Sequence, residues 1–189
     1  MFLTRRRIVE EVENGSINIE PFNPKNVGPN SVDVKLCNKL LVYDYSQEGC
    51  LDFKKENHTR ELIIPEEGLI LQPGTLYIGA TQETATSHKF IPIFEGRSSV
   101  GRLGIYTHIT AGFGDVGWGY THDENGELQC HFPTWTLEIH VVHPVRVYPG
   151  VRIGQVYFVE PSGEVEFYTG KYSMQKDPQP SRSWKDFQS

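Results

Sequence analysis

The chain has 189 residues, which suits a single domain spanning 1–189 and allows an apolar core without disulfide or metal staples. Its formal net charge of -6 argues against a nonspecific nucleic-acid binder, because such proteins present a surplus of Lys and Arg to the phosphates. With 38% hydrophobic residues, 18 Gly and 12 Pro, the composition predicts a folded, turn-rich protein and favours β structure.

The cysteines and the first residues bear on the cellular compartment. Cys37, Cys50 and Cys130 are odd in number, far apart and outside any CxxC pair, a usage that suits a reducing cytosol. The charged residues 5–7 are followed by acidic residues, without the apolar run that a signal peptide or membrane span requires. We therefore expect a cytoplasmic protein with no targeting or membrane segment.

The hydrophobic pattern predicts one helix and then a series of short strands. Over residues 4–14, Ile8, Val9 and Val12 fall on one helical face, with Thr4 as a candidate N-cap and Gly15 as a stop. Apolar runs between turn residues then predict strands at 31–36, 40–43, 61–64, 68–71, 76–80, 90–94, 105–110, 134–142, 145–148 and 151–159. Strands of this length indicate a mainly β barrel or sandwich with one or two helices.

The polar stretch 97–102 interrupts the strands and could begin a second helix. It supplies two guanidinium groups, two hydroxyls and several backbone amides within six residues, which are the groups that a phosphate chain needs. Alternatively, Arg97 and Arg102 pair with surface carboxylates while Ser98 and Ser99 cap a helix. The local sequence leaves both interpretations open, and no Walker motif supports the first.

The last segment, residues 168–189, is rich in Lys, Ser, Pro and Gln and shows no apolar period. This composition is typical of a tail that becomes ordered by contact with something else. A ligand or a neighbouring subunit would supply that contact.

Two carboxylates are candidates for chemistry. Strand alternation places Thr136 and Glu138 on one face and Leu137 on the other, so Glu138 lies either in a pocket, where it could take a proton from water, or on a solvated strand face. Asp115 follows a Gly-containing turn and is either a turn aspartate or a sugar or metal ligand.

The histidines do not form a zinc pattern. Five of the seven lie between residues 108 and 143, without HxxxH or HxE spacing, and the Pro-Cys-x-x-Cys of zinc nucleobase deaminases is absent. A deaminase built on this chain must therefore activate water without zinc. A Ser-His-Asp triad stays open on spacing alone, but no GxSxG elbow supports it.

Several ordered segments together form a specific set. They are GRSSVGRLG at 96–104, TAGF at 110–113 with Asp115, TLE at 136–138 and YPGVRIGQ at 148–155, followed by KY at 171–172, Gln175 and PSR at 180–182, with weaker PNSVDV at 29–34 and LQPG at 71–74. This set resembles the dCTP deaminase family, which shares a superfamily with the trimeric dUTPases. The resemblance extends over nearly the whole chain.

The resemblance implies a fold and an assembly. Members are similar to a distorted, dUTPase-like β-barrel with short helices, and they form homotrimers with active sites at subunit interfaces. The C-terminal tail, here residues 168–189, closes each site. We therefore expect a homotrimer that binds a small-molecule substrate, dCTP or dUTP, and neither nucleic acid nor membrane.

The resemblance also implies roles for individual residues. Glu138 would be the general base that activates water for attack on C4 of cytosine, and Asp115 would contact the deoxyribose 3′-hydroxyl. Arg97, Ser98, Ser99 and Arg102 would hold the triphosphate, with Mg²⁺ bound through the phosphates and no metal ligand supplied by the protein. The other substrate-binding residues would be Ala111, Thr136, Leu137 and Gln155, with Tyr168, Lys171 and Gln175 closing over the nucleotide.

The product is left open by the resemblance. The sequence around Ala111 and Gly112 is similar to members that make dUMP from dCTP, whereas strictly deaminating members tend to carry a bulkier residue after the alanine. The chain is therefore expected to be a dCTP deaminase, with or without dUTP cleavage, that supplies a precursor for thymidylate synthesis. The alternatives are a dUTP diphosphatase without deaminase activity and a non-catalytic nucleotide-binding regulator.

The chain departs from the family pattern between Asp115 and Glu138. Residues 118–132 make a longer connection, in which Asn125 and Gly126 predict a hairpin tip. This insertion either lies over the base pocket, where it could change the preference for a modified cytosine, or is a surface elaboration.

Overall fold

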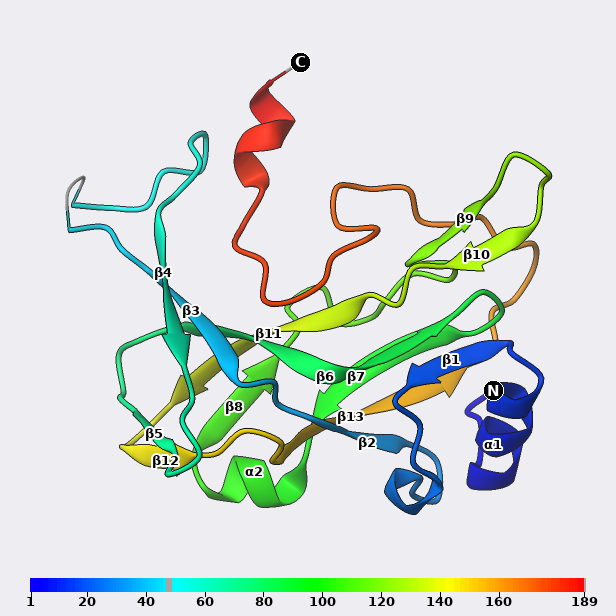
Figure 1. The fold of residues 1–189 in the computed structure, drawn as a ribbon, viewed down its shortest axis with the longest axis horizontal. Coiled ribbons are helices and arrows are strands. Elements are labelled where there is room, and N and C mark those ends of the chain that lie inside the picture. The colour runs from blue at the N-terminus through cyan, green and yellow to red at the C-terminus, as the bar shows by residue number, and fades with distance from the viewer. Residues whose placement is uncertain (47–48, 189) are drawn as a thin grey trace.

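The structure, a computed structural model, describes residues 1–46 and 49–188, so Ser189 at the end of the predicted tail lies outside the described residues. Strands dominate the described residues, which confirms the mainly β class (Figure 1). The helices are α1 (Arg5–Glu13), η1 (Pro24–Asn26), α2 (Ser98–Arg102) and η2 (Ser183–Phe187). The strands are β1 (Ile17–Glu20), β2 (Val32–Lys35), β3 (Lys39–Tyr43), β4 (Thr59–Ile63), β5 (Leu69–Leu71), β6 (Tyr77–Ser87), β7 (Ile91–Gly96), β8 (Ile105–His108), β9 (Tyr120–His122), β10 (Leu128–Cys130), β11 (Thr134–Val141), β12 (Val145–Val147) and β13 (Arg152–Val159).

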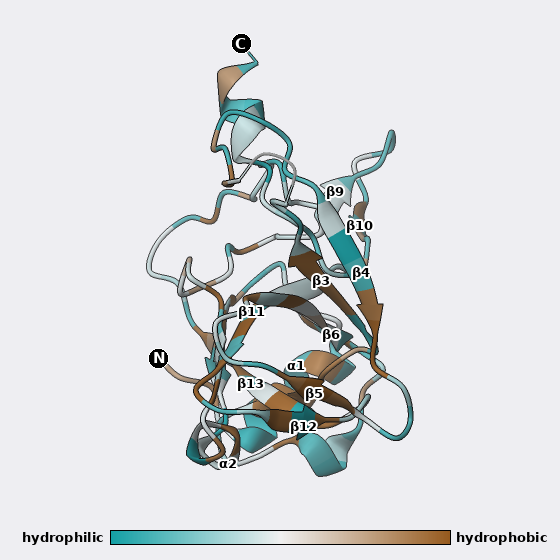
Figure 2. Cartoon of the chain, turned by 90° about the vertical axis from the view of Figure 1, so that its left-hand side faces the viewer, coloured by the Kyte–Doolittle hydropathy of each residue, from teal (hydrophilic) through white to brown (hydrophobic). Residues whose placement is uncertain are grey.

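The strands of the described part are distributed over two larger and two smaller sheets. The largest runs in the order β4-β3-β6-β11-β8, and β1 also pairs with β6. The second runs β2-β13-β7, while β5 with β12 and β9 with β10 form two-stranded sheets. All of these pairings are antiparallel. Figure 2 shows hydrophobic positions along β3 and β5 and mostly hydrophilic loops near the C-terminus.

Local pattern predicted most of these elements. The N-terminal helix, the short helix at 98–102, the ten strands named from apolar runs and the hairpin tip at Asn125 and Gly126 are all confirmed, with ends that shift by a few residues. β1 and the second half of β6, residues 81–87, were missed. Residues 81–87 were missed because they are polar, TQETATS, and yet Glu83 and all three threonines among them are buried.

The core lies between the sheets and follows the alternation of the strands. On β11, Trp135, Leu137 and Ile139 point into the core, whereas Thr136 and Glu138 are half-buried on the opposite face. Side chains of a strand alternate between its two faces, so the burial of the odd-numbered residues fixes the direction in which Glu138 points.

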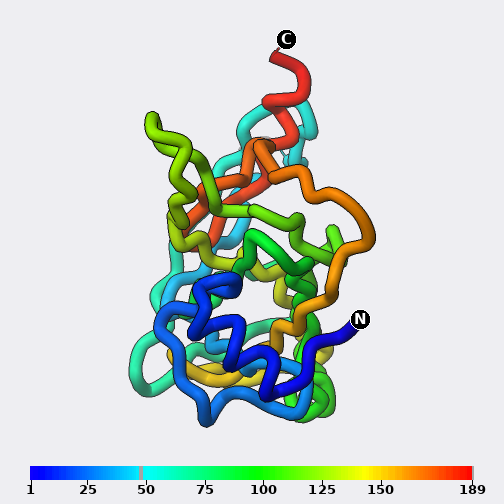
Figure 3. The backbone as a smooth tube through the Cα atoms, turned by 90° about the vertical axis from the view of Figure 1, so that its right-hand side faces the viewer, coloured from blue at the N-terminus to red at the C-terminus, as the bar shows by residue number. Residues whose placement is uncertain are grey.

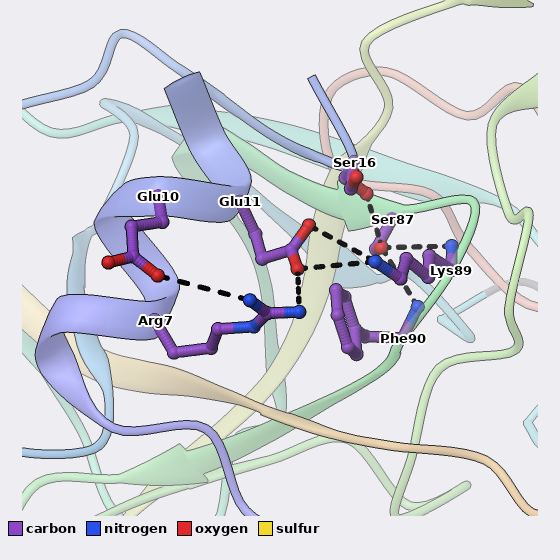
Figure 4. Close-up of polar contacts among 7 residues, drawn as sticks. All are labelled: Arg7, Glu10, Glu11, Ser16, Ser87, Lys89 and Phe90. Carbon is purple, nitrogen blue, oxygen red and sulfur yellow. Dashed lines mark hydrogen bonds and ion pairs between the residues drawn. The ribbon is translucent and has the colours of Figure 1, made fainter. Parts of the chain in front are cut away.

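A buried ion-pair network attaches α1 to the turn between β6 and β7 (Figure 4). The Glu11 carboxylate, in a residue only 1% exposed, contacts Arg7 at 2.6 Å and Lys89 at 3.2 Å. In the same turn, the Ser87 hydroxyl donates to the Ser16 carbonyl at 2.5 Å and accepts from the backbone N–H of Phe90 at 2.9 Å. Burial raises the pKa of Glu11, but hydrogen bonds from Ser16 and Lys89 and the charges of Lys89 and Arg7 outweigh it, so the net pKa is lowered.

Glu11→Gln should therefore destabilise the fold by about 1–3 kcal/mol near pH 7, because two cations lose a charged acceptor. A carboxylate with a lowered pKa stabilises the fold above its ordinary pKa, and this contribution is lost as pH falls through the folded-state value. The difference in melting temperature between parent and variant should therefore shrink towards pH 3. Glu10→Gln, on the same helix but paired with the exposed Arg6, is the control and should cost much less. A difference that stays constant with pH would contradict this account.

Candidate active site

A cavity of about 690 Å³ lies between β11, the loop after β8 and the C-terminal tail. Its walls are aromatic and aliphatic, with a small number of polar groups, as in most small-molecule sites. The lining residues that the sequence singled out are Ala111, Asp115, Thr136, Glu138, Tyr168 and Gln175. Residues distant in the sequence thus meet at one concave site.

Glu138 is held in a fixed orientation within this cavity. Its Oε2 atom accepts a hydrogen bond from the backbone N–H of Thr110 at 3.0 Å and another from the Thr110 hydroxyl. Both hydrogen bonds end on Oε2, so neither occupies the Oε1 atom of Glu138. A half-buried carboxylate anchored through one oxygen can receive a proton from a bound water on the other.

A stack of rings lies beside Glu138. Tyr106, His108 and His140 lie 5.0–6.1 Å apart between ring centroids, with planes within 15° of parallel. His108 is the register partner of Glu138 across β8 and β11, and both histidines line the cavity. Neither histidine was among the predicted site residues. Alternation along β11 could have placed His140 beside Glu138, but the position of His108 depends on strand register.

The loop from 109 to 118 shapes the opposite wall. Gly112 has a φ of +81°, a conformation that L side chains rarely adopt. The N–H of Gly114 donates to the Pro92 carbonyl at 2.8 Å, and a Cβ at position 114 would lie 2.5 Å from the Trp135 ring. This close approach sets the path of the loop and places Asp115 at the cavity.

The tail lies over the cavity and is held by contacts within its own chain. The indole Nε1 of Trp118 donates to the Tyr172 carbonyl at 2.9 Å, and the N–H of Thr134 donates to the Gln175 carbonyl at 3.1 Å. Further along, the N–H of Gln179 donates to the Thr136 hydroxyl at 3.2 Å. In Figure 3 the orange and red tail runs along the upper end of the molecule, whereas α1 occupies the lower half. These contacts within one chain give the tail a defined position over the cavity.

The remaining predicted site residues lie outside the cavity walls. The four residues expected to hold the triphosphate lie at α2, at the end of the molecule opposite to the tail (Figure 1). They are Arg97, Ser98, Ser99 and Arg102. Gln155 lies on β13, where its side chain accepts a hydrogen bond from the Ser31 hydroxyl at 3.1 Å. In the tail, Lys171 pairs with Asp186 at 2.6 Å. The side chain of Leu137 is fully buried in the core, so only its backbone could meet a nucleotide.

The insertion contributes one side chain to the cavity and otherwise extends away from it. Trp118 lines the cavity and packs on Trp135, with 5.0 Å between ring centroids. The β9–β10 hairpin projects from the body of the molecule (Figure 1), and its His122 stacks on Phe167 just before the tail, 5.7 Å away. The insertion thus supports the base of the tail.

Residues 1–46 and 49–188 contain neither a metal-binding cluster nor a helix that could cross a membrane. No group of three or more His, Cys, Asp and Glu side chains is arranged to hold a metal ion. No helix in the same ranges has the length and apolar character needed to cross a membrane.

Comparison with known proteins identifies the family of the chain. The family described as dCTP deaminase-like matches residues 2–160, and the chain belongs to this family. A protein from Clostridium acetobutylicum named "dCTP deaminase, dUMP-forming" is 48% identical over 189 residues, covering 99% of both chains. Proteins of the same name from Cytophaga hutchinsonii and Hathewaya histolytica are 48% and 46% identical and cover 95% and 100% of this chain.

A solved structure supports the fold class. The crystal structure of a 2′-deoxycytidine 5′-triphosphate deaminase from Agrobacterium tumefaciens superposes with a TM-score of 0.56 at 20% identity. The match covers 84% of this chain and 48% of that one. This likeness concerns the fold.

Proposed function

We propose that the protein hydrolyses dCTP to dUTP and ammonia and then cleaves dUTP to dUMP and pyrophosphate, supplying a precursor for thymidylate synthesis. The proposal rests mainly on the position of Glu138. Its carboxylate is anchored by Thr110 and faces a cavity of about 690 Å³, which is large enough for a nucleotide base and sugar. Family membership and the names of the relatives support the same reaction.

In the proposed deamination, Glu138 takes a proton from water as the water oxygen forms a bond with C4 of cytosine. The same carboxylate passes that proton to N3, which neutralises the negative charge that develops on the ring. A second proton then moves from the new hydroxyl to the exocyclic amine, the C4–N bond breaks, and ammonia leaves behind a C4 carbonyl. In this scheme the carboxylate activates the water without zinc.

Asp115 and Thr136 are proposed to place the nucleotide, since both line the cavity with Glu138. Asp115 would accept a hydrogen bond from the 3′-hydroxyl, and Thr136 would contact the base. Tyr168 and Gln175 of the tail would cover the nucleotide. Ala111 lines the same wall and limits the space around the base.

Magnesium would enter with the triphosphate. Mg²⁺ prefers six oxygen ligands, and in this proposal phosphate oxygens and water make up its shell. When bound, the ion would offset phosphate charge. Arg97 and Arg102 would contact the remaining phosphate oxygens.

The dUMP-forming step is proposed from the loop beside the base. The residue after Ala111 is Gly112, which has a φ of +81° and carries no side chain. In the proposed complex, the lack of a side chain after Ala111 leaves room for a second water, near the phosphates. The three relatives described above are named as dUMP-forming.

Product analysis tests this function. Purified protein with dCTP and Mg²⁺ should release ammonia, dUMP and pyrophosphate in equal amounts, with little free dUTP, when the products are separated by ion-exchange chromatography. dUTP as the sole nucleotide product would restrict the enzyme to deamination. Cleavage of added dUTP without ammonia release from dCTP would identify a dUTP diphosphatase instead.

A homotrimer is proposed because α2, which ends at Arg102, lies at the end of the molecule opposite to the tail that lines the cavity. A nucleotide in the cavity would reach Arg102 only if a second copy presents its α2. Arg102→Ala alone should weaken dCTP binding about tenfold or more, since a charge-assisted contact contributes roughly 1.5–3 kcal/mol. Sedimentation should give three times the mass of the chain, and an active monomer would refute the assembly.

Subunit mixing separates a shared site from a self-contained one. Arg102→Ala and Glu138→Gln should each be nearly inactive at low dCTP. Refolding them together should restore part of the activity, because some sites then combine an intact Glu138 from one chain with an intact Arg102 from another. If each site were complete within one chain, the mixture would stay as inactive as its components.

A further inference from the structure

One carboxylate holds two guanidinium groups near the start of α2. Asp33, within β2, accepts from the Nε of Arg97 at 2.9 Å through Oδ1 and from an Nη of Arg152 at 3.0 Å through Oδ2. The exposed fractions of the three side chains are 17%, 25% and 50%, respectively. The ion pairs are thus partly shielded from water, and each is a charge-assisted hydrogen bond of good geometry.

Two of the three residues lie on strands of one sheet, and the third directly follows its third strand. Asp33 lies opposite Gln155 on β13, while Arg152 begins β13 and Arg97 directly follows β7. A further hydrogen bond joins an Nη of Arg97 to the Arg152 carbonyl at 3.5 Å. The sheet therefore sets the position of the Asp33 carboxylate, and the carboxylate in turn sets the direction of both guanidinium groups.

Arg97 retains hydrogen-bonding capacity after these contacts. A guanidinium has five N–H donors, and the contacts to Asp33 and to the Arg152 carbonyl use two of them. The other three stay available beside Ser98 and Ser99, which are exposed. Two guanidinium charges and one carboxylate also leave the group with a net charge of +1.

We infer that Asp33 is a positioning residue for phosphate recognition: it fixes Arg97 and Arg152 in the orientation that receives the triphosphate. The inference rests on the proposed function, which places the triphosphate at Arg97. Asp33 itself does not touch the nucleotide, since a carboxylate would repel phosphate oxygens. It holds the Arg97 and Arg152 guanidinium groups side by side, although their like charges repel each other.

Charge and position predict opposite effects for Asp33→Asn, which makes the inference testable. Removing a carboxylate raises the local positive charge, so electrostatic attraction alone predicts tighter binding of a polyanion. Loss of positioning predicts weaker binding. Glu95→Gln is the matched control, because Glu95 is exposed on β7 and lies opposite the same Gln155, and its loss changes the charge by the same amount.

The experiment measures binding of inorganic triphosphate with Mg²⁺ by titration calorimetry on the full chain. Asp33→Asn should weaken binding about tenfold, the loss expected when one charge-assisted contact is misplaced, while Glu95→Gln should bind as well as the parent or more tightly. With dCTP, the variant should show a KM about tenfold higher and a kcat within about twofold of the parent. Parental or tighter triphosphate binding by Asp33→Asn would overturn the inference.

A second variant covers the case in which Asp33→Asn fails to fold. Arg152→Lys keeps the charge on a half-exposed side chain but replaces the planar fork by a single ammonium, and it should weaken triphosphate binding several-fold. Unchanged binding in that variant would overturn the inference.

If the parent binds triphosphate in an Asp33-dependent way but releases no ammonia from dCTP, the proposed function fails and the positioning role stands. If the parent deaminates dCTP and Asp33→Asn keeps the parental KM, only the positioning role fails.

Discussion

Glu138→Gln should bind dCTP nearly as well as the parent and release ammonia about 10⁴-fold more slowly. A positioned general base contributes about 10²–10⁴ in rate, and this one handles the proton of water and its delivery to the ring, so the loss should reach the upper end. The amide oxygen of glutamine can still accept from the N–H and hydroxyl of Thr110, so the side chain should keep its orientation. Only the capacity to take a proton is removed.

The measurement combines a calorimetric dCTP titration, an ammonia assay and a thermal melt of each variant. Glu124→Gln, in the exposed turn of the β9–β10 hairpin, is the matched control and should retain the parental rate. Ammonia release by folded Glu138→Gln within tenfold of the parent would show that Glu138 is not the base. The proposed mechanism would then be wrong.

Ending the chain after Gly170 should leave a folded protein with little activity, lower in kcat/KM by about 10²-fold or more, because the nucleotide loses its cover. The removed segment carries Tyr172, Gln175, Gln179, Pro180 and Ser181 of the cavity wall. It adds little to the apolar core, so thermal unfolding should stay cooperative.

A shorter truncation is the control for this experiment. Ending the chain after Arg182 removes η2 but keeps every tail residue that lines the cavity, and it should preserve most of the activity. Steady-state kinetics with dCTP on both truncations, together with their melting curves, checks the prediction. Full activity of the chain that ends at Gly170 would rule out a closing role for the tail.

The local sequence was sufficient for features that depend on neighbouring residues. Alternating apolar residues placed Glu138 on the face of β11 opposite to the core, and Asn125 with Gly126 predicted the hairpin tip. The helical face containing Ile8 predicted α1. These predictions succeeded because backbone periodicity and turn geometry are set within a few residues of the chain.

Only the tertiary structure decided which polar residues are buried and which candidates meet. Residues 81–87 become a buried strand because partners elsewhere satisfy their polar groups: Glu83 accepts from the Lys35 N–H at 2.7 Å, and the Thr86 hydroxyl donates to the Trp118 carbonyl at 2.5 Å. Burial raises the pKa of Glu83, and the backbone and charge of Lys35 partly offset this.

The same limit applies to the site. Strand register placed His108 beside Glu138, and the fold put α2, which ends at Arg102, and the tail at opposite ends of the molecule. The ordered motifs were sufficient to predict the family and a set of candidate site residues, so the sequence by itself determined both. Which of those residues share a cavity depends on contacts between segments that are far apart in the sequence, and no local pattern encodes such distances.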